Sequence, residues 1–284
     1  MKKPTTLTPA VERLIAETLA MEAESAQDAG ALGFLARAMV QATLPHKRVE
    51  GAFFERRNGA FTLTLLAPPR IGLPYGSIPR LLLAWVATEA VRTKSRELEL
   101  GDSMAAFMAQ LDMARQGANI TRLKDQTKRL FSSTVNAIYD DGEKTAILNQ
   151  TIADKTVLWW DAPAPEQAAL WQSTVKLSEQ FFAEVTAHPV PIDMRAILAL
   201  KKSPLALDIY GWLTYRASYA KTPSTIPWEA LAAQFGSDYG RLRAFKAAFL
   251  TELRKVATTY TGAEFEVTEA GLVIKPGRPH IARQ

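Results

Sequence analysis

The residues best suited to chemistry are basic side chains that recur at helical spacing in two stretches of the chain. In residues 238–256 they are Arg241, Arg243, Lys246, Arg254 and Lys255. In residues 119–132 they are Arg122, Lys124, Lys128 and Arg129. Lysine and arginine on one side of a helix can contact phosphates, and arginine can read guanine in the major groove of DNA. The pattern predicts two helices that bind nucleic acid.

Both stretches also carry an apolar face opposite the basic one, as a helix packed on a core requires. The apolar residues are Ile120, Leu123, Leu130 and Phe131 in the first stretch, and Leu242, Phe245, Phe249, Leu253 and Val256 in the second. Small residues such as Ala247 share the outer face of the second, where a methyl group can meet thymine. A basic outer face is also typical of a merely solvated helix, so the neighbouring elements have to decide between the two interpretations.

Patterns typical of enzymes are missing from the sequence. It has no cysteine, no Walker loop and no Gly-x-Gly-x-x-Gly fingerprint, and His46, His188 and His280 lie far apart. Tyr210, Tyr215 and Tyr219 could supply a DNA-nicking nucleophile, but no cluster of metal ligands or arginines accompanies them, so we expect them in the core. The sequence therefore predicts a protein with no catalytic residue, no metal and no cofactor.

Composition narrows the class further. At about 150 residues per domain, a chain of 284 residues has room for two domains, and 48% hydrophobic with 22% charged residues is ordinary for a globular protein. No apolar run approaches the roughly 18 residues of a membrane span, and threonines follow the basic start where a secretory signal would be apolar. We expect a cytoplasmic protein without a membrane partner. A net charge of +5 permits nucleic acid as a partner without demanding it.

The hydrophobic periodicities along the chain predict two sets of elements that follow the same order. The first set comprises a helix at 78–95, a strand at 96–100, helices at 103–113 and 119–132, and strands at 134–139, 145–150 and 157–160. The second set comprises a helix at 204–218, an extended piece at 225–228, helices at 229–235 and 238–256, and strands at 263–268 and 272–275. Helix, strand, helix, helix and hairpin is the order of a winged helix, in which the helix before the hairpin enters the major groove.

The predicted fold class is therefore α+β, with two tandem winged-helix domains and an N-terminal extension. The extension, residues 1–75, contains a helix at 9–29 and a hairpin at 52–65 around Asn58-Gly59, a strong turn signal. The domains span 76–162 and 163–284, and Asp161 to Pro165 is interpreted as a stiff linker. The helix at 9–29 either contacts a partner or packs on its own domain, and the first winged helix could serve mainly as a dimer interface.

Three motif groups resemble the plasmid RepA-type replication initiators. One is Leu44-Pro45-His46-Lys47 before the hairpin, and another is Gly72-Leu73-Pro74-Tyr75-Gly76 leading to Pro79-Arg80-Leu81-Leu82-Leu83. The third is Val190-Pro191-Ile192-Asp193 followed by Ser203-Pro204-Leu205-Ala206-Leu207-Asp208-Ile209-Tyr210 and Trp212-Leu213. The resemblance covers residues 44–280 and is specific as a set, although each motif is short.

The resemblance implies a non-enzymatic initiator. Such proteins bind repeated sites, called iterons, in double-stranded DNA at a plasmid origin, help to open the adjacent duplex, and recruit host replication proteins including the replicative helicase. It also implies that the C-terminal winged helix holds the iteron, while the N-terminal one contributes to DNA contact and dimerisation. The matched motifs are structural, so they point to no particular base-reading residue.

Two other classes stay open. A transcriptional repressor could use the same fold, and initiators often repress their own promoters. A DNA-processing enzyme would require metal-dependent nicking of origin DNA. Within the initiator interpretation, we expect the main DNA contacts from Arg241, Arg243, Lys246, Arg254 and Lys255, and secondary ones from the basic residues of 119–132.

Overall fold

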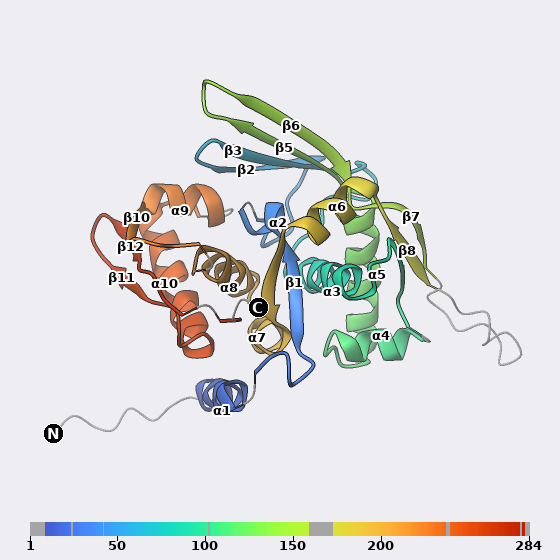
Figure 1. The fold of residues 1–284 in the computed structure, drawn as a ribbon. Coiled ribbons are helices and arrows are strands. Elements are labelled where there is room, and N and C mark those ends of the chain that lie inside the picture. The colour runs from blue at the N-terminus through green and yellow to red at the C-terminus, as the bar shows by residue number, and fades with distance from the viewer. Residues whose placement is uncertain are drawn as a thin grey trace, which may run out of the picture.

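Two groups of helices and strands flank a central pair of helices in the computed structural model (Figure 1). The structure describes residues 9–23, 25–41, 43–101, 103–158, 173–217, 219–236, 239–278 and 280–281. The central helices are α3 (Ser77–Thr93) and α8 (Pro204–Ala217), which contact each other. The protein mixes helix and sheet, as predicted.

The first group follows the predicted order along the chain. After α3 come β4 (Glu97–Glu99), α4 (Met104–Gln110), α5 (Gly117–Phe131), β5 (Thr134–Asp140) and β6 (Thr145–Thr151). Ser103 caps α4, because its hydroxyl oxygen accepts a hydrogen bond from the Ala106 N–H at 3.1 Å. Leu123 and Leu130 of α5 are fully buried, and the helix packs on α3.

The predicted hairpin is confirmed as β2 (Phe53–Asn58) and β3 (Phe61–Leu66). Its turn is shifted by one residue, because Asn58 pairs with Phe61 and the two central residues are Gly59 and Ala60. Only Gly59 of this pair has positive φ, at 60°, so the I′ geometry expected for Asn58-Gly59 is wrong. The hairpin joins β5 and β6 in one antiparallel sheet of order β2-β3-β5-β6, at the top of Figure 1.

The hairpin beside β4 is not the one that the sequence indicated. β4 pairs with β8 (Thr174–Leu177), which pairs in turn with β7 (Ala153–Val157), whereas β5 and β6 extend the sheet of β2 and β3. The expectation that 134–150 forms the wing of the first module is therefore wrong. β8 lies beyond the predicted boundary at residue 162, and the predicted linker 161–165 lies outside the described residues. The domain boundaries stay a prediction.

The second group carries the predicted elements in the predicted order. After α8 come β10 (Ser224–Pro227), α9 (Trp228–Phe235), α10 (Leu242–Thr259), β11 (Phe265–Val267) and β12 (Gly271–Ile274). β12 pairs with both β10 and β11, so the strand between the helices closes onto the final hairpin. Gly236 ends α9, as predicted. The tandem winged-helix architecture as a whole stays a prediction.

The N-terminal part packs against elements from the C-terminal half of the chain. β1 (Leu32–Ala36) pairs with β9 (Pro189–Asp193), and α2 (Arg37–Gln41) contacts α8. α1 (Pro9–Ala23) ends before the predicted residue 29. It packs on α7 (Met194–Leu200) and α10, which lie in the predicted domain 163–284 and not in the N-terminal extension. Leu19 on this helix is 61% exposed, although it is apolar.

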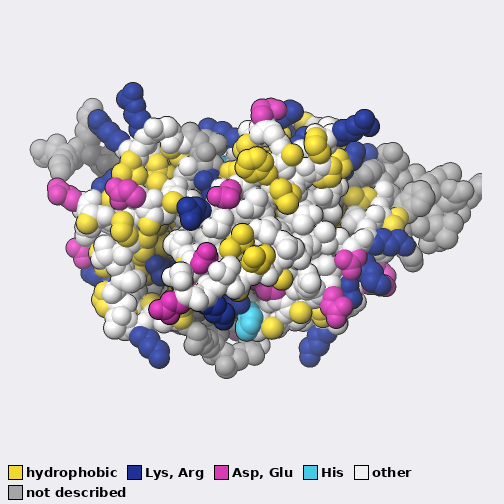
Figure 2. All heavy atoms as spheres, turned by 90° about the horizontal axis from the view of Figure 1, so that it is seen from above, with side chains coloured by type: hydrophobic (Ala, Val, Ile, Leu, Met, Phe, Trp, Pro, Cys, Tyr) yellow, Lys and Arg dark blue, Asp and Glu magenta, His cyan; other side chains and the backbone are white. Residues whose placement is uncertain are grey.

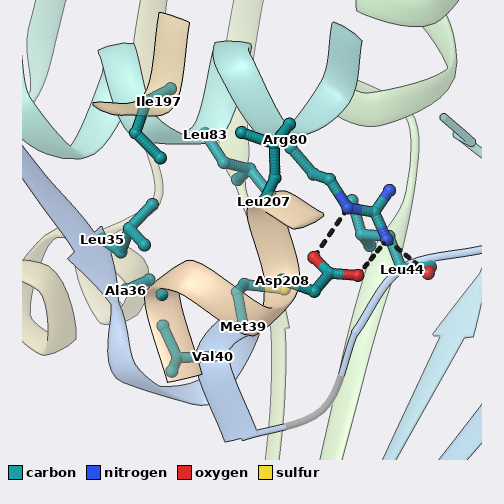
Figure 3. Close-up of a pocket in the computed structure, with 11 residues that line it drawn as sticks. Leu35, Ala36, Met39, Val40, Leu44, Arg80, Leu83, Ile197, Leu207 and Asp208 are labelled. Carbon is teal, nitrogen blue, oxygen red and sulfur yellow. Dashed lines mark hydrogen bonds and ion pairs between the residues drawn. The ribbon is translucent and has the colours of Figure 1, made fainter. Parts of the chain in front are cut away.

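A buried ion cluster joins the two groups at α3 and α8 (Figure 3). Arg80 of α3 donates to both carboxylate oxygens of Asp208 of α8 at 2.7 Å, and His46 lies 2.7 Å from Asp208. The Arg80 guanidinium also donates to the backbone carbonyls of Leu44, Pro45 and Gly76. Burial opposes the carboxylate charge, but Arg80 and the hydrogen bond from His46 hold the pKa of Asp208 below its ordinary value. Burial lowers the pKa of His46, which keeps the ring neutral.

The motifs that resemble the replication initiators meet at this cluster. His46 comes from the first motif, Arg80 from the second and Asp208 from the third. Tyr210 of the third motif accepts a hydrogen bond from the Asp193 N–H at 2.9 Å. These motifs therefore supply the side chains that join the two groups. A cavity of about 40 Å³, lined mainly by apolar side chains such as Leu35, Val40 and Leu83, lies beside the cluster.

We predict that Arg80→Met destabilises the protein by about 3–5 kcal/mol, because it leaves the buried Asp208 charge without its main partner. The measurement is the free energy of unfolding from denaturant titration. Arg92→Met is the matched control on the same helix, since Arg92 is exposed and pairs only with Glu89 three residues earlier. It should cost under about 1 kcal/mol. Equal losses in the two variants would contradict the role of the cluster.

Candidate nucleic-acid interface

The outer face of α10 is exposed and carries arginine beside small residues. Arg243 and Arg254 are exposed on this face, as are Ala247 and Thr251. The opposite face packs into the second group, since Phe245, Phe249, Leu253 and Val256 are buried. Leu242 is an exception to the predicted stripe: it is 40% exposed at the first turn. The face could meet base edges without obstruction by a large apolar side chain.

The start of α10 differs from the prediction. The helix begins at Leu242, with Arg241 at its N-cap, and not at 238. The predicted caps, Ser237 and Asp238, lie outside the described residues. Arg241 is exposed, but it stands ahead of the helix. It therefore approaches a ligand from the turn and not from the helical face.

The two other predicted residues of this helix have protein partners. The Lys246 ammonium lies 4.5 Å from the ring centre of Trp228, a cation–π contact that holds the side chain beside α9. Lys255 pairs with Glu252 at 2.7 Å. Thus Arg243 and Arg254 share the outer face, while Lys246 and Lys255 lie on its flanks.

The basic residues of α5 divide in the same way. Arg122 and Lys128 are exposed, and Lys124 is half-buried. The Arg129 side chain is only 14% exposed, because it folds back onto the chain that precedes α3. Its guanidinium binds the Asp125 carboxylate at 2.9 Å, donates to the Leu73 carbonyl at 3.3 Å and lies over the Tyr75 ring. Arg129 therefore has structural partners and does not join the exposed face.

The strand β7 brings a further lysine to α5 that the sequence analysis missed. Lys155 is exposed on β7 and lines a groove of about 410 Å³ with Lys124 and Lys128. Because 134–150 was the predicted wing, no local pattern pointed to 153–157. The alternation in Ala153–Val157 was the available signal, but Asp154 and Lys155 side by side obscure it.

The tips of the outer sheet offer little to a phosphate backbone. Arg56 is buried, and its guanidinium lies 4.6 Å from the centre of the Phe54 ring. Arg57 is exposed. Asp140 and Asp141 are exposed at the β5–β6 turn, where their carboxylates would repel phosphates.

The three tyrosines predicted in the core differ in burial: Tyr215 is half-buried, and Tyr219 is 47% exposed, so the prediction is wrong for Tyr219. Tyr210 is fully buried, its hydroxyl lies 2.8 Å from His280, and burial raises its pKa. His46 belongs to the ion cluster, and His188 is exposed at the end of α6 (Glu179–Ala187). Within the described ranges, no three histidine or carboxylate side chains gather as metal ligands, and no helix is long and apolar enough to cross a bilayer.

Comparison with known proteins identifies the family. The model of the family described as "Plasmid encoded RepA protein" matches residues 73–229, which is more than half of the chain. The chain belongs to this family. The RepA match spans the ion cluster residues Arg80 and Asp208 and all of α5. The search of curated proteins found no match.

Solved structures support the fold of this RepA-family chain. Two structures of domains 2 and 3 of RctB match 84% of the chain. One has 11% sequence identity, a TM-score of 0.56 and 97% of its own length covered; the other has 12%, 0.53 and 96%. At this identity the likeness concerns the fold alone.

We predict that Arg129→Ala lowers the free energy of unfolding by about 1–3 kcal/mol, because a half-buried charged hydrogen-bond network is lost. Lys128→Ala, one residue earlier and exposed, should stay within about 0.5 kcal/mol of the wild type. Denaturant titration of both variants checks this. A smaller loss in Arg129→Ala than in Lys128→Ala would contradict the structural role of Arg129.

Proposed function

We propose that the protein is a plasmid replication initiator that binds repeated origin sites in double-stranded DNA through α10 and α5. The observation that carries the proposal is the exposed outer face of α10, where Arg243 and Arg254 flank Ala247 and Thr251. Arginine suits guanine and phosphates, and small side chains let the helix approach base edges. Membership of the RepA family supports the role in replication.

In this proposal α10 reads the iteron and α5 adds a second contact, through Arg122, Lys124 and Lys128. Helping to open the duplex and recruiting the host helicase follow from the family resemblance and not from a site in the structure. The protein would act by binding, without a catalytic residue, metal or cofactor, in the cytoplasm where plasmid DNA is replicated.

The runner-up is a transcriptional repressor with the same DNA-binding surface. Gene and flanking DNA can be placed on a fragment without another origin, and establishment of a plasmid is scored. Replication that requires the gene supports the initiator, whereas replication without the gene defeats it. Metal-dependent nicking of supercoiled origin DNA by the purified protein would instead indicate a DNA-processing enzyme.

We predict that Arg243→Ala weakens binding to the origin repeat by about 1–3 kcal/mol, because a base-reading arginine is lost, and relaxes specificity at one base pair. Titration of the duplex repeat and of its single-base variants measures this. Arg92→Ala, an exposed arginine on α3, is the control and should bind like the wild type. Wild-type affinity in Arg243→Ala would remove this residue from the interface.

We further propose that a second copy of the chain pairs with the edge strand β6. The sheet order ends at β6, and the strand contains no charged residue or proline among Thr145–Thr151. Such an edge is a template for strand pairing, and proteins that stay monomeric usually protect it. Exposed apolar side chains lie on one face of the same sheet, namely Phe53, Leu66 and Ile147. Figure 2 looks onto this side of the molecule and shows yellow clusters on it.

We predict that Ile147→Lys raises the dimer dissociation constant about tenfold or more, because a lysine on the edge disfavours pairing. Sedimentation equilibrium measures the constant. Val267→Lys is the control, since Val267 is an exposed apolar residue of β11, in the sheet of β10, β12 and β11. A wild-type protein that stays monomeric at all concentrations would contradict the proposal.

A further inference from the structure

The groove between α5 and β7 has an excess of positive charge that its own carboxylates do not offset. Its charged lining consists of Lys124, Lys128, Lys155, Asp125 and Asp154. Both aspartates are already engaged by arginines outside the lining: Asp125 by Arg129 at 2.9 Å and Asp154 by Arg96 at 2.7 Å. The groove lining therefore has a net positive charge.

A β-bulge explains how Lys155 comes to face the groove. Ala153 pairs with Leu177, so a regular antiparallel register would place Asp154 opposite Lys176. The register shifts between Ala153 and Lys155, and Lys155 takes the place opposite Lys176. The bulge thus places Lys155 as well as Asp154 beside Lys176. Bulges often re-aim a side chain beside a functional site.

Lys155 and Lys176 carry like charges on neighbouring strands, and the Glu97 carboxylate attracts both. Like charges directly opposite each other on neighbouring strands are destabilising. Lys176 binds Glu97 at 2.9 Å, on the side of β8 that faces away from β7. Among the described residues, no carboxylate lies within ion-pair distance of Lys155 or Lys128, although Glu97 attracts Lys155 from further away. A strand that brings a lysine to this position has an arrangement suited to an external anion.

We infer that this groove holds the phosphodiester backbone of the DNA that α5 contacts, with Lys155 and Lys128 as phosphate ligands on its two walls. The inference rests on the proposed DNA binding and adds β7 to the interface. The groove is open and about 410 Å³ in volume, and the hydroxyls of Ser132 and Thr156 lie in its lining. A backbone held here fixes how α5 lies against the duplex, since phosphate contacts set the register of a protein on DNA.

The test is Lys155→Gln in the full chain, titrated with a duplex origin repeat and with a random-sequence duplex at several salt concentrations. One lost phosphate contact should lower affinity for both duplexes alike, on the order of fivefold at physiological salt, and reduce the slope of log K against log salt by about 0.9. Lys144→Gln is the control, because Lys144 is an exposed lysine at the acidic β5–β6 turn. It should leave affinity and slope unchanged.

A second readout separates this role from a structural one. Lys155 is exposed and faces both Lys176 and Glu97, so Lys155→Gln should unfold at about the same denaturant concentration as the wild type. Lower stability together with lower affinity would overturn the inference, as would a wild-type salt slope in a normally folded variant. If the wild type binds no duplex, the proposed function fails and the groove assignment fails with it. If the wild type binds and Lys155→Gln matches it, only the groove assignment fails.

Discussion

The structure depends on the buried pairing of Arg80 with Asp208. It joins the helix that opens the first group to the helix that opens the second, and five hydrogen bonds from one guanidinium fix the position of both. A planar guanidinium is suited to this, because its donors fork toward a carboxylate and toward backbone carbonyls at once. Burying a salt bridge costs desolvation free energy, so its main contribution is to fix the relative position of the two helices. Because α5 packs on α3 and α10 packs on α8, fixing α3 against α8 also fixes α5 relative to α10.

That placement matters because neither helix carries many free cations. On α10 the exposed face has two arginines, and on α5 Arg129 is turned inward. A surface of few charges gains specificity when its parts are held rigidly, since less order has to be imposed on binding. A second tie, between Lys201 after α7 and Asp112 before α5, joins the same two groups near the start of α5. Rigid joining and sparse charge are thus complementary features of one interface.

The sequence predicted the elements well and their pairing less well. Apolar periodicity located α5, α8, α9 and α10, because each buries one stripe on a core. It could not tell that β4 pairs with β8 and not with the next hairpin, since strand partners depend on contacts between distant residues. The same limit applies to Arg129. Its contacts with the Leu73 carbonyl and the Tyr75 ring turn it inward, and both partners lie more than 50 residues away in the sequence. Lys155 escaped prediction because β7 pairs with β8, and no local pattern marks that pairing.

The pairing of β1 with β9 has a consequence for the synthesis of the protein. Leu32–Ala36 leaves the ribosome long before Pro189–Asp193 exists, because more than 150 residues separate the two strands. At about 5–20 residues per second the gap lasts on the order of ten seconds. During that time β1 lacks its strand partner, and Arg80 lacks Asp208, which is made later still. The first group therefore stays incomplete during translation, and the contacts between the two groups form only when most of the chain has been made.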